Sequence, residues 1–158
     1  MTDNYIGIMI ESLRRKKDVL TDILKLSEEQ GLLLDDPNLE PDTFEKNVNR
    51  KAALIDKLEQ LDTGFESLYD KVKEELESNR DIHKEQIRQM QELIRALTEL
   101  NMQIQATEAR NKEKATAKFA YIRQQAKEIR SSQKIVKEYY NNMMHKAYNE
   151  PHFLDNKK

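Results

Sequence analysis

Apolar side chains recur every three or four residues along most of this 158-residue chain. Near the start they stand at Ile6, Leu13 and Leu20 and at their neighbours one turn away, which places them on one stripe of a helix. This spacing predicts a first helix over residues 4–34. The rhythm stops at residues 35–41, where two prolines and several acidic side chains predict a loop.

A second apolar stripe follows the loop and repeats about every 3.5 residues from Phe44 to Leu76. That period is typical of helices that supercoil around their neighbours with a left hand. Asp42 and Glu45 stand at the spacing of a capping box, in which each side chain binds a free amide at the start of the helix. We therefore expect a second helix over residues 43–78.

Polar residues at positions 78–81 predict a tight turn, and a third stripe beyond it predicts a helix over residues 81–110. Residues 42–150 hold no proline and a single glycine, so nothing in that span obliges a helix to stop. The pattern therefore indicates an all-α protein. Residues 1–110 would form an elongated antiparallel bundle or coiled coil of three long helices.

A C-terminal amphipathic extension follows a run without bulky apolar side chains, residues 105–114. From Phe119 onward apolar positions return at intervals of four and three, which predicts a helix over residues 111–145. Residues 146–158 show no repeat and predict a flexible tail.

Two interpretations of the extension stay open. It packs against the first helix as an ordinary core helix, or its apolar stripe grips another protein. The second interpretation rests on an alanine and a glutamine in the stripe, which reduce its apolar surface, and on the tyrosines and methionines at its end. The partner-binding residues would then be Ile122, Ile129, Val136, Tyr139, Tyr140 and Met143.

Composition predicts a narrow core and removes several kinds of chemistry. Hydrophobic residues make up 37% of the chain and charged residues 35%, which suits helices with broad wet faces. The absence of cysteine removes disulfides, thiol catalysis and thiolate zinc sites. His83, His145 and His152 have no partner at metal-ligand spacing, so we expect solvated histidines and no metal site.

Catalytic and membrane signals are also missing from the sequence. It lacks a glycine-rich phosphate loop, a nucleophile elbow and the paired Glu-x-x-His motifs of a di-iron bundle. We therefore expect no enzymatic activity and no cofactor. Because no apolar run approaches the roughly 20 residues of a bilayer-spanning helix, and no signal peptide is recognisable, we expect a soluble cytoplasmic protein.

Charge divides the chain into two unlike regions. Residues 1–108 hold 15 basic and 24 acidic side chains, whereas residues 109–137 hold 9 basic and 2 acidic ones. Basic side chains beside the C-terminal stripe form a strip that could follow a nucleic-acid backbone, an acidic partner or the acidic flank of the chain's own bundle. This basic strip comprises Lys112, Arg123, Lys127, Arg130, Lys134 and Lys137.

Three sequence stretches resemble the flagellar export chaperones of the FlgN and FliT type. The most specific is residues 51–62, KAALIDKLEQLD, and it is supported by residues 93–101, LIRALTELN, and residues 108–111, EARN. The resemblance implies a small cytoplasmic all-helical chaperone. Its C-terminal region would bind flagellar axial subunits, the hook-associated or cap proteins, keep them export-competent and deliver them to the export apparatus.

Two other classes of function remain as alternatives. One is a structural coiled-coil protein whose C-terminal stripe pairs with a second copy, giving a homo-oligomer. The other is a regulator that binds nucleic acid or a transcription factor through the basic strip.

Overall fold

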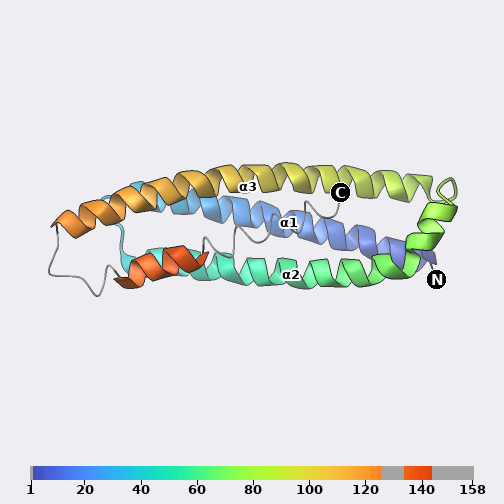
Figure 1. The fold of residues 1–158 in the computed structure, drawn as a ribbon, viewed down its shortest axis with the longest axis horizontal. Coiled ribbons are helices and arrows are strands. Elements are labelled where there is room, and N and C mark those ends of the chain that lie inside the picture. Colours follow the sequence, from blue (N-terminus) through green and yellow to red (C-terminus); the bar gives the residue numbers. More distant parts are fainter. Residues whose placement is uncertain (1, 126–133, 144–158) are drawn as a thin grey trace.

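The computed structural model describes residues 2–125 and 134–143, and every secondary-structure element in these ranges is a helix. The long helices are α1 (Thr2–Asp35), α2 (Pro41–Ser78) and α3 (Lys84–Gln125). Successive long helices run antiparallel, so α1 and α3 point the same way, and a short helix over residues 134–143 lies beside the end of the bundle that carries the α1–α2 loop (Figure 1). The expected all-α architecture of three long helices with a C-terminal helical extension is confirmed.

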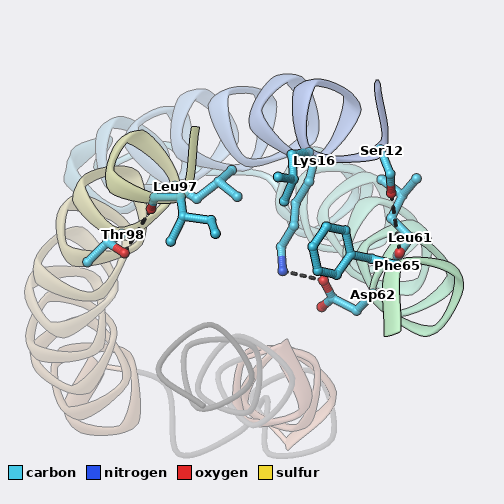
Figure 2. A pocket seen from close by; sticks show the side chains of 9 residues that line it. Ser12, Lys16, Leu61, Asp62, Phe65, Leu97 and Thr98 are labelled. Atoms are coloured by element: carbon cyan, nitrogen blue, oxygen red, sulfur yellow. Dashed lines mark hydrogen bonds and ion pairs between the residues drawn. The ribbon is translucent and has the colours of Figure 1, made fainter. Parts of the chain in front are cut away.

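The three long helices form an arc. The α1 backbone contacts both α2 and α3, whereas no such contact joins the described backbones of α2 and α3. A view along the bundle shows α1 in the middle of the arc and the 134–143 helix on the concave side (Figure 2). The concave face is therefore where a fourth helix finds room between α2 and α3.

The start of α2 corrects the expected capping box. The helix begins at Pro41, with Glu40 at the N-cap in an extended conformation, and no side chain among the described residues caps this end. Proline is suited to the first helical position because it has no amide hydrogen to leave unpaired and its φ is already helical. Asp42 consequently lies within the first turn, where its carboxylate is stabilised by the positive end of the helix dipole.

The expected helix end at residue 110 is also wrong, because α3 continues unbroken to Gln125. The run over residues 105–114 looked like a boundary since it has no bulky apolar side chain. In the structure Glu108 and Asn111 are only 1% exposed, so this run carries buried polar contacts to the other helices.

The corner between α2 and α3 is longer than expected, and α3 begins at Lys84. His83 is buried in this corner at 4% exposure, which contradicts the expectation that it is solvated. Its Nε2 lies 3.4 Å from Glu75 Oε1 and its Nδ1 lies 3.7 Å from Asp3 Oδ1. The imidazole therefore lies between the end of α2 and the start of α1.

Buried apolar side chains fall into two clusters along the bundle. Within the described part of the chain, the first core cluster draws on the three long helices alone and comprises Ile6, Met9, Ile10, Leu13, Val19, Leu20, Ile23, Ile55, Leu58, Val72, Leu76, Met90, Leu97 and Ile104. The second core cluster lies near the α1–α2 loop and comprises Leu34, Phe44, Val48, Ala115, Phe119, Tyr140 and Met143. No helix in the described ranges is long and apolar enough to cross a membrane.

Candidate protein-binding site

The 134–143 helix packs the end of its apolar stripe onto the bundle. Tyr140 is 3% exposed and Met143 is 1% exposed. The Tyr140 ring stacks on Phe44 with centroids 6.2 Å apart and meets Phe119 edge-on at the same distance, which is a favourable spacing for aromatic pairs. The bundle surface that receives it, the docking surface, consists of Leu34, Phe44, Val48, Ala115 and Phe119.

This packing is what the first of the two interpretations of the extension expects. Tyr140 and Met143 have apolar partners within the chain itself. The docking surface is assembled from three helices, and its members are far apart in sequence. Each stripe alone therefore gave no sign that the bundle offers a complementary apolar face.

The other predicted partner-binding residues are less enclosed. Val136 and Tyr139 are half-buried at the edge of the second core cluster, and Ile122 is half-buried on α3 outside that cluster. A hydrogen bond with Glu45 is the main cause that raises the pKa of Tyr139 above its usual 10. Ile129 lies outside the described residues.

A polar layer lies between the two core clusters and touches the docked helix. It consists of Ser27, Gln30, Lys51, Glu108 and Asn111. Gln30 Nε2 donates to Met143 Sδ at 2.7 Å, and Asn111 Nδ2 donates to Gln30 Oε1 at 3.1 Å. Asn111 Nδ2 also donates to the Ser27 carbonyl at 2.7 Å, while Ser27 Oγ donates to Glu108 Oε1 at 2.6 Å.

The ion pair in this layer is fully enclosed. Lys51 pairs with Glu108, and their side chains are 0% and 1% exposed. Burial lowers the pKa of Lys51 from its ordinary 10.5 to about 7. Removing two charges from water is costly, so such a pair contributes little net stability but disfavours helix registers that leave either charge alone.

Buried ion pairs account for the two charged residues at the ends of the most specific stretch of the family resemblance. Lys51 and Asp62 begin and end the stretch over residues 51–62, and Asp62 forms a second buried ion pair, with Lys16. Sequence analysis did not identify these residues as a network. The available signal was the presence of charged residues within otherwise apolar seams, at positions that face neighbouring helices.

A close approach between α1 and α3 accompanies the polar layer. A methyl group added at Gly31 would lie 2.8 Å from Asn111 Oδ1, which is closer than real side-chain contacts. Asn111 is held by its bonds to Ser27 and Gln30, so it cannot move aside without breaking them. Glycine is retained inside this helix because the neighbouring amide occupies the space.

The basic strip is divided by the structure. Lys112, Arg123, Lys134 and Lys137 are exposed, and Lys127 and Arg130 lie outside the described residues. Nearby basic side chains outside the predicted strip contact the chain's own acidic loop: Lys114 Nζ is 2.9 Å from Asp35 Oδ2, and Lys118 Nζ donates to the Asp36 carbonyl at 2.6 Å. Some of the positive charge of this region thus serves to hold α3 against the α1–α2 loop.

The site's chemistry is that of helix packing. Within the described ranges, no group of three histidine, cysteine, aspartate or glutamate side chains could hold a metal ion. The arrangement instead offers an amphipathic helix and the apolar surface that it covers. Both are features that proteins use to bind helical partners.

Comparison with known proteins identifies the family. No curated protein and no solved structure matches the chain significantly. A family model described as FlgN protein matches residues 1–145, which is nearly the whole chain. Members of this family are non-enzymatic chaperones for flagellar hook-associated proteins during export. The chain, with its three long helices and docked C-terminal helix, belongs to the FlgN family.

Proposed function

We propose that this FlgN-family chaperone acts in the cytoplasm, where its C-terminal region binds a hook-associated protein, the client, and the 134–143 helix leaves the docking surface when it does so. The client would be kept export-competent and passed to the export apparatus. The observation that carries the proposal is the burial of Tyr140 and Met143 against a separate apolar surface. A binding stripe that is covered in the free chain has to be uncovered before a partner can use it.

The docked helix is held by few contacts. Among its described residues, Tyr140 and Met143 are buried and Val136 and Tyr139 are half-buried, so docking depends on a few apolar side chains. Burying two large side chains such as Tyr140 and Met143 contributes roughly 3–6 kcal/mol as an upper estimate. A client helix that buries a longer apolar face can supply more than this.

Because the 134–143 helix has to undock before the client binds, undocking lowers the apparent affinity for the client. If docking is favoured by about 3 kcal/mol, roughly 1% of molecules are open, and the apparent affinity is about a hundredfold weaker than that of the open form. Weakening the docking surface should therefore tighten client binding. Damaging the stripe itself should weaken it.

Two substitutions separate these effects. Phe44→Leu removes a ring that stacks on Tyr140 but leaves the stripe intact, so client affinity should rise about fivefold, corresponding to about 1 kcal/mol of lost aromatic contact. Val136→Ser with Tyr140→Ser damages the stripe and should abolish co-purification of the hook-associated protein. Unchanged capture by the double variant would contradict the site.

Ile135 provides a matched control on the same helix. Its side chain is 52% exposed, so Ile135→Ser makes the same kind of change away from the docked stripe. Capture should persist in this variant, and circular dichroism should show that the long helices keep their helical content in all three variants.

A further inference from the structure

A buried amide on α1 points at the docked helix. Gln30 is 0% exposed, and its Nε2 donates to the sulfur of Met143, which is itself 1% exposed. An enclosed amide donor without an acceptor is costly, because it has given up its hydrogen bonds to water. The Met143 sulfur is therefore both apolar filling and the acceptor that Gln30 meets when the 134–143 helix is docked.

Neighbouring hydrogen bonds fix which end of the Gln30 amide faces the docked helix. Asn111 Nδ2 donates to the backbone carbonyl of Ser27, a group that can only accept. The same Nδ2 donates to Gln30 Oε1 at 3.1 Å. A flipped Gln30 amide would bring two NH2 groups together and set its oxygen against the sulfur of Met143. The network therefore favours the orientation that turns a donor toward the docked helix.

This donor distinguishes a thioether from an aliphatic side chain. Leucine and methionine are close in volume, and exchanging them in an apolar core usually costs little. At position 143 the methionine sulfur is a weak acceptor, whereas leucine offers none. Leucine would leave Gln30 Nε2 buried without its partner in the docked form, while undocking lets water reach the amide. The penalty therefore falls on docking and not on the folding of the three long helices.

We infer that Gln30 is a specificity-determining residue of the docking surface, selecting a helix that brings a hydrogen-bond acceptor to the place of the Met143 sulfur. The occupant that it selects is the chain's own 134–143 helix. There Tyr140 meets the aromatic rings, and Met143, three residues further on and on the same face, meets Gln30. This inference rests on the proposed function, because it names a contact that holds the free chaperone closed.

A double-mutant cycle on the full chain tests this inference. Met143→Leu is made in wild type and in Gln30→Leu, which leaves no donor to lose its partner. Amide hydrogen exchange within residues 134–143 then reports opening of the helix without any client. Met143→Leu should speed this exchange about fivefold more in wild type than in Gln30→Leu, because the difference in packing between methionine and leucine is common to both.

Met9 provides the matched control for the exchange of methionine for leucine. It is 1% exposed within the first core cluster, so Met9→Leu should leave exchange within residues 134–143 as it is in wild type. Gln30→Met also removes the donor and keeps a long unbranched side chain. It takes the place of Gln30→Leu in the cycle if that variant does not fold.

Affinity for a purified hook-associated protein gives a second readout. Any direct contact of residue 143 with the client is the same in both backgrounds. Met143→Leu should therefore raise this affinity about fivefold more in wild type than in Gln30→Leu, because more molecules are open.

The two readouts separate this inference from the proposed function. An equal change of exchange rate in the two backgrounds, or an effect of Met9→Leu as large as that of Met143→Leu, would overturn the inference. A fivefold difference in exchange without a matching difference in affinity would support the role of Gln30 and contradict the proposed coupling of undocking to client binding.

Discussion

The two halves of the bundle bury their apolar side chains in different ways. Among the described residues, the first core cluster draws on α1, α2 and α3 alone, whereas the second includes Tyr140 and Met143 from the 134–143 helix. Removing that short helix would expose Phe44 and Phe119 to water but leave the first cluster intact. Under the proposed function, the first half is a permanent core and the second is an exchangeable half, whose short helix leaves the docking surface when the client binds.

The polar layer explains how the halves can behave independently. Gln30, Lys51 and Glu108 interrupt the apolar seam between the clusters, so loss of packing at one end does not remove apolar contacts at the other. Local opening with a small free energy is expected where few buried apolar contacts hold an element. The contact from Gln30 to Met143 links this layer to the exchangeable helix.

The largest effect is expected from breaking the ion pair between the two halves. Lys51→Met leaves the Glu108 carboxylate buried without its cation and should lower the free energy of unfolding by about 4 kcal/mol. Adding Glu108→Leu to Lys51→Met should recover most of that loss, because two apolar side chains leave no buried charge without a partner. Urea unfolding of both variants measures this, and an unchanged stability in Lys51→Met would show that the pair is not buried.

A truncation in the permanent core comes next. Leu58 is 0% exposed in the first core cluster, so Leu58→Ala should lower the free energy of unfolding by about 3 kcal/mol. Leu58→Met, which conserves volume, should cost less than about 1.5 kcal/mol and serves as the control. Equal losses in the two variants would argue against a close-packed core at this position.

The pH dependence of the free energy of unfolding should be a smaller effect than these two substitutions, and its cause should be the titration of Lys51. Its folded pKa of about 7 lies below the ordinary 10.5, so above pH 7 the unfolded chain keeps a proton that the folded chain has released. Stability therefore rises with pH, by about 1 kcal/mol between pH 6 and pH 8. This increase should disappear in the Lys51→Met, Glu108→Leu variant, which removes both buried titratable groups, and an identical slope in wild type and this variant would contradict the assignment.

The smallest change in global stability is expected in the exchangeable half. Tyr140→Ser should lower the free energy of unfolding of the long helices by less than about 1 kcal/mol, because the 134–143 helix can open locally. Amide hydrogen exchange should meanwhile speed up within residues 134–143 and stay slow in α1. A loss as large as that of Leu58→Ala would mean that the two halves are one cooperative core.

The long helices could be predicted from the sequence because each apolar stripe is a local pattern. The contacts between the helices could not be predicted from these patterns. The spacing around Phe44 and the spacing around Tyr140 each indicate an amphipathic helix, but neither shows that the two rings stack. Whether an apolar stripe is covered depends on which helices meet in space, and that is a property of the whole bundle.

The errors at the ends of helices have local physical causes. The second helix begins at Pro41 and not with the expected capping box, because proline can start a helix without leaving an amide unpaired. The helix end expected at residue 110 was wrong because Glu108 and Asn111 are polar residues that lie buried within a continuous helix, where they contact the other helices. A polar run within a helix can mark either solvent or a buried network, and sequence hydropathy alone does not separate the two.

The central claim, that the 134–143 helix must leave the docking surface for the client to bind, has a direct test. Tyr139 and Glu45 interact across the edge of the docked helix and both remain half-exposed, so Glu45→Cys with Tyr139→Cys can be bridged by a short reducible thiol reagent. The account predicts that the bridged protein loses capture of the hook-associated protein and regains it on reduction. Equal capture before and after reduction would contradict it.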